Sequence, residues 1–202
     1  MKLTLDGQQL DLAELKNVET FAELIRNLEN RLAPERVIVS MTLDEVPLDP
    51  EAEKAKADAR IENLEKLEIR TQRVVELASN TLNTLIDYLP GLIEAVDECV
   101  KLFQGGDESQ AHRRLGALID GLQMVSQAWR GIVAFIDIED GKPGEMMPDM
   151  QAFFSILQAI LQAQINGDTV QICDNLEFEL VPVLESWLEH ATTLRERLTR
   201  KV

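Results

Sequence analysis

Apolar residues recur at steps of three and four from Ala78 to Phe103, which predicts a long amphipathic helix. The phase of this pattern continues through Pro90. Because proline removes one backbone hydrogen bond and clashes with the carbonyl four residues back, we expect one continuous helix with a kink at Pro90. The stripe consists of Ala78, Leu82, Leu85, Leu89, Leu92, Val96, Cys99 and Phe103.

Three further helices are predicted by similar stripes in the rest of the chain. The second covers residues 107–138 and the third covers 150–166, and the Gly- and Pro-rich segment 139–149 forms the longest loop between them. The fourth begins at Asp168 and keeps its phase through Pro182, so we expect it also to be a single helix.

A Gly-Asp corner joins the first helix to the second, and another joins the third helix to the fourth. In Gly106-Asp107 and in Gly167-Asp168, the glycine suits the left-handed residue after a helix, and the aspartate can cap the next helix. Corners this short make the neighbouring helices antiparallel. The pattern therefore predicts an up-down four-helix bundle over residues 72–202.

The corners also predict which residues lie at the same depth in this bundle. Pro90 and Pro182 are both about 21 Å from the corner end at about 1.5 Å per residue, and Trp129 and Trp187 lie within about one turn of each other. We infer a shared layer of two bent helices and two indoles. We favour a bulky core layer, and the alternative is a pocket or groove for a partner segment.

The predicted third helix carries no charged residue from Met150 to Gly167, although charged residues make up 28% of the chain. Apolar residues occupy part of it, and amide and hydroxyl side chains occupy the rest at helical spacing. Since surfaces covered by protein are depleted in charge, we expect this helix to be covered. The cover is either the N-terminal domain or another chain. The polar stripe consists of Gln151, Ser155, Gln158, Gln162 and Asn166.

Residues 1–71 show a different pattern, with short alternating runs and one amphipathic helix. Asp6-Gly7 is a hairpin signal, and Thr20 with Glu23 forms a capping box before a helix that ends at Pro34. Pro47 restricts its own strand to a sheet edge. Short strands are predicted over residues 2–5, 8–12, 36–43, 46–48 and 67–70, and a charged segment, which we expect to be a short solvated helix or crossover, covers 50–62.

This order of elements resembles that of the β-grasp, or ubiquitin-like, fold. The sequence therefore predicts an α+β protein with two domains: a small β-grasp-like domain over residues 1–71, followed by the four-helix bundle over 72–202. No Gly-Gly follows the last strand, so conjugation as a modifier is not expected. Domains of this kind commonly serve as docking surfaces.

Composition limits the partners and the compartment. The 202 residues carry a net charge of −16, which repels nucleic-acid phosphates and anionic lipids, so neither nucleic acid nor membrane is expected as a partner. The chain shows no secretory signal. Cys99 and Cys173 lie on apolar stripes without a CxxC motif, which suggests buried, reduced thiols and a cytoplasmic protein.

Catalytic and cofactor motifs are not apparent in the sequence. Only two histidines occur, His112 and His190, and neither has the Glu-x-x-His spacing of di-iron bundles. The pair Glu108 and His112 is read as an ordinary helix pair rather than a metal site. The acidic segment at Asp137 has its glycine one position too early for a calcium loop. We therefore expect a non-enzymatic protein without a metal or cofactor.

The second pair of helices, from Ile160 to Trp187, is similar to the flagellar export chaperones, acidic helical bundles that wrap a partner's disordered terminus. The whole chain looks more like a bacterial family that pairs a β-grasp-like domain with such a bundle. This resemblance implies a protein-interaction module, either an adaptor or a chaperone-like binder. The alternatives are a structural homo-oligomer, such as a homodimer, and a bundle that binds a small ligand. The candidate partner-binding residues are Gln151, Ser155, Gln158, Gln162, Trp129 and Trp187.

Overall fold

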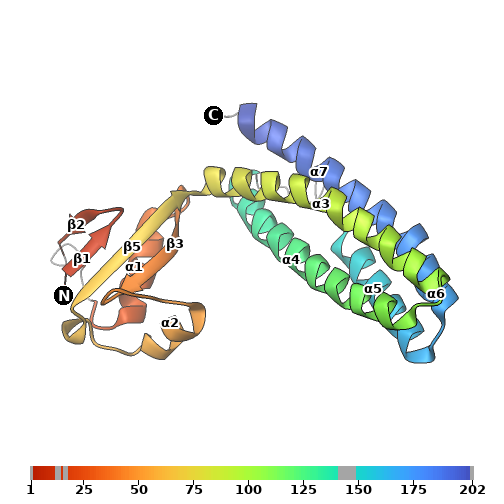
Figure 1. The fold of residues 1–202 in the computed structure, drawn as a ribbon. Coiled ribbons are helices and arrows are strands. Elements are labelled where there is room, and N and C mark those ends of the chain that lie inside the picture. Colours follow the sequence, from red (N-terminus) through yellow and green to blue (C-terminus); the bar gives the residue numbers. More distant parts are fainter. Residues whose placement is uncertain (1, 12–14, 16–17, 141–148, 201–202) are drawn as a thin grey trace. The chain divides into compact units, whose positions relative to one another are not determined.

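The computed structural model describes residues 2–11, 15, 18–140 and 149–200 (Figure 1). The protein belongs to the α+β class, with a five-stranded mixed sheet followed by helices, as the sequence predicts. The chain divides into two compact units, Met1–Leu77 and Ala78–Val202. The domain boundary predicted after residue 71 lies inside the last strand, β5 (Lys66–Arg73).

The sheet of the first unit has the strand order β2-β1-β5-β3-β4, so the last strand in sequence lies at the centre. β5 pairs in parallel with β1 and antiparallel with β3. β4 lies at an edge, as Pro47 requires. The strands are β1 (Lys2–Leu5), β2 (Gln8–Leu10), β3 (Arg36–Leu43), β4 (Val46–Pro47) and β5 (Lys66–Arg73).

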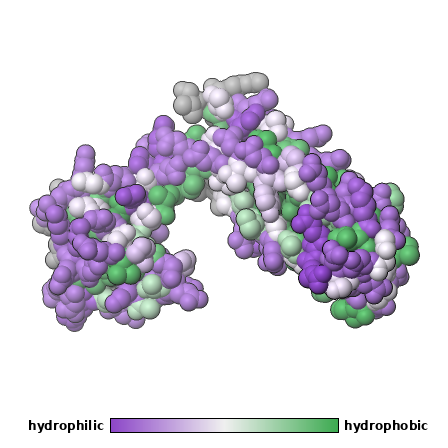
Figure 2. Space-filling view, in the orientation of Figure 1, coloured by the Kyte–Doolittle hydropathy of each residue, from purple (hydrophilic) through white to green (hydrophobic). Residues whose placement is uncertain are grey.

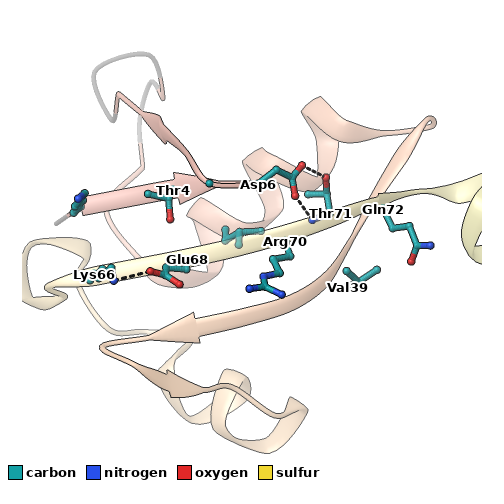
Figure 3. A pocket seen from close by; sticks show the side chains of 11 residues that line it. Thr4, Asp6, Val39, Lys66, Glu68, Arg70, Thr71 and Gln72 are labelled. Atoms are coloured by element: carbon teal, nitrogen blue, oxygen red, sulfur yellow. Dashed lines mark hydrogen bonds and ion pairs between the residues drawn. The ribbon is translucent and has the colours of Figure 1, made fainter.

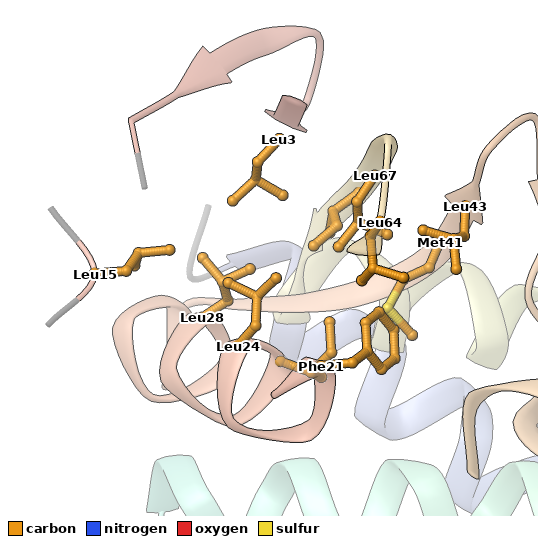
Figure 4. Close-up of a cluster of buried hydrophobic side chains, with 11 residues drawn as sticks. Leu3, Leu15, Phe21, Leu24, Leu28, Met41, Leu43, Leu64 and Leu67 are labelled. Carbon is orange, nitrogen blue, oxygen red and sulfur yellow. The ribbon is translucent and has the colours of Figure 1, made fainter. Parts of the chain in front are cut away.

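One helix, α1 (Phe21–Leu32), contributes the other half of this unit's core. The predicted capping box starts it: Thr20 accepts from the Glu23 backbone N–H, and the Glu23 carboxylate accepts from the Thr20 backbone N–H. Its apolar stripe meets the inward residues of β1, β3 and β5 in one cluster (Figure 4). This cluster includes Leu3, Phe21, Leu24, Ile25, Leu28, Met41, Leu43, Leu67 and Ile69.

The segment between β4 and β5 is mostly solvent-exposed, as its charged composition predicts. It contains the short helix α2 (Pro50–Lys56), capped by Asp49, and a 3₁₀ turn, η2 (Ile61–Asn63). Neither buries a residue fully. Leu10 ends β2, and Leu12, which we assigned to the same strand, lies outside the described residues.

The second unit is built from long helices that follow the predicted stripes. α3 (Val74–Gln104) runs continuously through Pro90, and all eight residues of its predicted stripe are buried. α4 (Glu108–Asp140) follows, and α5 (Met150–Asn166) begins after its cap Asp149. Glu139 and Asp140, assigned to a loop from the sequence, belong to α4, and most of the rest of that loop lies outside the described residues.

Both Gly-Asp corners are confirmed. Gly106 and Gly167 have φ of 77° and 66°, in the left-handed region that favours glycine. Asp107 and Asp168 each accept a hydrogen bond from the backbone N–H three residues on, at 3.2 Å and 3.0 Å. Each glycine therefore ends one helix, and each aspartate starts the next.

The last helical stretch differs from the expected single α-helix. It consists of α6 (Thr169–Asp174), a π-helical segment η4 (Asn175–Leu180) and α7 (Val181–Arg200). The Val181 N–H bonds to the carbonyl of Leu176, five residues back, and Pro182 follows with no N–H to donate. We attribute the wider turn to this proline. The apolar stripe from Cys173 to Leu198 nevertheless remains buried, as predicted.

Among the described residues, no helix combines the length and the apolar character needed to cross a membrane.

Candidate functional site

The two tryptophans expected to share a layer are in contact. Trp129 of α4 and Trp187 of α7 meet edge to face, with ring centroids 6.4 Å apart and an angle of 70° between the rings. Phe153 of α5 approaches Trp187 more closely, with centroids 4.7 Å apart. The depth count from the corners predicted the indole pair but did not include Phe153.

This aromatic layer is core rather than surface. Trp129, Trp187 and Phe153 are each 1% exposed or less. Neither indole nitrogen has a hydrogen-bond acceptor among the described residues. The two tryptophans, which the sequence predicts as partner-binding candidates, therefore cannot touch a partner while the helices remain packed, and they act through the shape of the core.

The four polar candidates on α5 are all exposed. The Ser155 hydroxyl donates to the Gln151 carbonyl at 3.0 Å, and the Gln162 amide donates to Asn166 at 3.1 Å. These bonds stay within the helix, and the side chains of Gln151, Ser155, Gln158 and Gln162 face solvent. The structure therefore brings these four candidates together on one helix and separates them from Trp129 and Trp187.

Large apolar side chains are also exposed on α5, and sequence reasoning missed this. The helix buries only Phe153, Ile160 and Ala163, so its apolar arc is wider than the core it faces. The sequence contained a signal for this exposure. The apolar residues of α5 cover all of its circumference except an uncharged polar stripe, and this arc is wider than a helix needs to pack on one core face. Phe154, Leu161 and Ile165 are 45%, 56% and 70% exposed.

The elements next to α5 also expose apolar side chains. α6 and η4 both contact α5, and each exposes a large apolar side chain: Val170 is 71% exposed and Phe178 is 63% exposed. Apolar atoms reach the surface around the corner between α5 and α6 (Figure 2). The two aspartates that bound the helix, Asp149 and Asp168, both cap helix N-termini.

The thiols near the corner end of this unit do not provide a nucleophile. Burial, helped by Cys173 and opposed by Arg114, raises the pKa of Cys99 to about 11. Burial also raises the pKa of Cys173, together with the charges of Asp174 and Glu177. Both thiols are free and buried, as predicted, and both stay protonated at neutral pH.

His112, of the Glu108–His112 pair, contacts side chains of two other helices. Its ring packs edge-on against Phe103, with centroids 5.2 Å apart. Its Nδ1 lies 3.3 Å from the side-chain nitrogen of Gln164, which joins α4 to α5. His112 therefore supports the packing of the helices beside the corners.

The fold and this surface define an α+β protein whose helical unit presents an uncharged, partly apolar helix to solvent. Residues 80–190, more than half of the chain, match the family described as Domain of unknown function (DUF8042). The chain therefore belongs to this family. The matched region begins within α3 and ends within α7, so it includes all of α5. No curated protein and no solved structure matches the chain.

Proposed function

We propose that this protein is a non-enzymatic protein-interaction module, an adaptor or chaperone-like binder, and that it holds its partner on the outer face of α5. This α5 face is defined by Gln151, Phe154, Ser155, Gln158, Leu161, Gln162 and Ile165. The observation that carries the proposal is the exposure of large apolar side chains on a helix without a single charge.

A single exposed apolar side chain is ordinary on a protein surface, but several large ones on one side of a helix are not. Phe154, Leu161 and Ile165 are spaced by seven and four residues, which places them along one side of α5. The amide groups of Gln158 and Gln162 lie among them and can hydrogen-bond a partner without the desolvation cost of a charge. Interfaces show this combination of apolar anchors and depleted charge.

The shape of the face suits a helical partner. α5 has 17 residues, and at about 1.5 Å per residue it is about 25 Å long. A partner helix with apolar residues at i, i+7 and i+11 would match the spacing of the exposed anchors. Charged residues in the partner would then lie at the margins of the contact.

We also propose a specific fold for each of the two units. We propose that the first unit is a β-grasp fold, because one helix covers one face of a mixed sheet with β5 at its centre. We propose that the second unit is an up-down four-helix bundle, because the two short corners reverse the chain between helices. The free thiols support a reducing compartment such as the cytoplasm.

Affinity capture with matched variants tests the interaction. Ile165→Lys places a charge on the α5 face, and Val46→Lys places one at a similarly exposed apolar position in the first unit. We expect the wild type and Val46→Lys to retain the same proteins from a native-host extract and Ile165→Lys to lose them. Identical captured proteins for all three chains would refute the proposal.

A homo-oligomer is the second candidate, and the lack of charge on the α5 face favours it. Two chains that each carry −16 repel one another over most of their surfaces, whereas the α5 face adds no like-charge repulsion. Light scattering over a range of protein concentrations distinguishes the two. A doubled mass that Ile165→Lys returns to that of a monomer would identify self-association.

A further inference from the structure

The face of the sheet opposite α1 contains a hollow of about 640 Å³. Side chains alternate along β5: Leu67 and Ile69 point into the core with α1, so Lys66, Glu68 and Arg70 point to the other side. Figure 3 shows these three residues following one another along β5 in the hollow.

Positive charge is in excess along β5 in this hollow. Lys2 on β1 lies directly opposite Lys66 on β5, and Lys66 forms an ion pair with Glu68 at 2.6 Å. Lys66 lowers the pKa of Glu68 through a hydrogen bond and its charge, and the charges of Arg70 and Lys2 lower it further. Among the residues that line this part of the hollow, the carboxylate of Glu68 therefore lies among three cations, and the charge of Glu45, which is outside the lining, also acts on Lys66.

The other carboxylate in the hollow is already engaged. Asp6 accepts hydrogen bonds from the Thr71 backbone N–H at 2.7 Å and from the Thr71 hydroxyl at 2.6 Å. It also forms an ion pair with Arg36 at 3.1 Å. Asp6 and Arg36 balance each other, so the lining cations outnumber the remaining lining carboxylate by two.

This excess is local in a strongly acidic chain, which makes it a candidate site for a negatively charged ligand. We propose that the open face of the sheet binds an extended acidic peptide segment of a partner protein. The carboxylates of the segment engage Arg70 at one position and the Lys2–Lys66 pair at another. Arg70 can hold a carboxylate with two parallel hydrogen bonds, and Thr4 adds a neutral hydroxyl.

The dimensions favour an extended peptide over a small anion. Arg70 lies four positions after Lys66 along β5, which is about 13 Å at about 3.3 Å per residue. Side chains on one side of an extended peptide repeat at about 7 Å, so acidic residues four positions apart reach both ends of the hollow. A polynucleotide is disfavoured relative to a short acidic segment, because its phosphates continue past the cations of the hollow into the field of a chain with a net charge of −16.

This site is separate from the α5 face, because it lies wholly on the first unit. The result of a binding test on the hollow therefore does not affect the proposal for α5. A binding measurement with the full chain and a synthetic probe tests it directly.

The probe is a fluorescein-labelled peptide of alternating Glu and Ser, with its ends blocked, and binding is followed by fluorescence anisotropy. We expect the wild type to bind it, with an affinity that falls as salt is added. Arg70→Gln should weaken binding about tenfold, since a charge-assisted hydrogen bond is lost. Lys2→Gln should also weaken it. Arg26→Gln, a matched change on the exposed side of α1, should bind like the wild type.

Circular dichroism and thermal unfolding of each variant confirm that the fold is kept, and Lys2→Gln provides a second test if Arg70→Gln unfolds. The proposal is overturned if the wild type does not bind the Glu peptide, or if the same peptide with Gln in place of Glu binds equally well. It is also overturned if Arg26→Gln weakens binding as much as Arg70→Gln, or if a single-stranded oligonucleotide binds more tightly than the peptide.

Discussion

Trp129 of α4 and Trp187 of α7 meet edge to face in the core, with their ring centroids 6.4 Å apart. The contact joins the second helix of the unit to the last, and Phe153 adds α5 to the same layer. Three helices therefore share one aromatic layer. Since α5 contributes Phe153 to the core and Phe154 to the surface, the layer also fixes how the α5 face is presented.

Trp187→Ala should lower the free energy of unfolding by about 3–5 kcal/mol, because it removes a large buried side chain and leaves a cavity. Trp187→Phe should cost less than half as much. Phenylalanine keeps the ring contacts, and it removes an indole N–H that has no acceptor among the described residues. Urea unfolding followed by circular dichroism measures both changes.

Phe178→Ala is the matched control for this pair, because Phe178 is an aromatic residue of the same unit that is largely exposed. It should change stability by less than about 0.5 kcal/mol. If Trp187→Phe destabilised the protein as much as Trp187→Ala, the indole nitrogen would have an essential partner, and this account of the layer would be wrong.

Gly121 of α4 leaves room for two side chains of α3. A Cβ atom at this position would lie 2.8 Å from Leu92 Cδ1 and 2.8 Å from the Tyr88 hydroxyl. Gly121→Ala should therefore lower the free energy of unfolding by about 1–2 kcal/mol, since overpacking outweighs the better helix propensity of alanine. Thermal unfolding measures the effect.

Gly116 provides the comparison in the same helix, because a Cβ atom there would meet nothing within 4 Å. Gly116→Ala should raise stability by up to about 1 kcal/mol. Opposite signs for the two glycines would support the packing of Leu92 and Tyr88 against Gly121, and equal stabilisation by both substitutions would disprove it.

Asp6 should make the first unit sensitive to acid. Hydrogen bonds from the Thr71 hydroxyl and N–H, together with the charge of Arg36, lower the pKa of Asp6 below its ordinary value of 3.8. A lowered folded-state pKa stabilises the protein above the ordinary pKa, and this stabilisation is lost as the pH falls through the folded-state value. The contribution is below about 1 kcal/mol, because Asp6 and Arg36 are both more than one-third exposed.

Asp6→Asn isolates this contribution, because asparagine tolerates the φ of 50° at this turn residue. Thermal unfolding from neutral pH down to about pH 3 should show that the wild type is more stable than Asp6→Asn at neutral pH. This difference in stability should disappear as the pH falls. Asp58→Asn, at an exposed carboxylate of the same unit, controls for loss of charge. A gap between wild type and Asp6→Asn that did not change with pH would contradict the assigned role.

Much of this fold could be predicted because its signals are local. The Gly106 and Gly167 corners, the Thr20 capping box and the stripe of α3 each depend on residues within one or two helical turns. Counting along helices from the corners then brought Trp129 and Trp187 to the same depth, because the rise per residue in a helix is constant.

Other features depend on contacts that local pattern does not encode. The π-helical segment before Pro182 depends on where each backbone N–H finds its acceptor. The cations of the sheet hollow come together only because β1 pairs with β5, which places Lys2 opposite Lys66 across most of the first unit's sequence. The exposure of Ile165 follows from how little of α5 the core can cover.

Site-specific photocrosslinking shows whether a protein binds the α5 face, because it traps whatever touches this face in the cell. A photoreactive residue replaces Gln158 on α5 or, in the control chain, the exposed Gln127 on α4. We expect the residue at Gln158 to yield a discrete covalent adduct with a protein, identified by mass spectrometry, and the residue at Gln127 to yield none. No adduct at Gln158, or the same adducts at both positions, would contradict the proposal for α5.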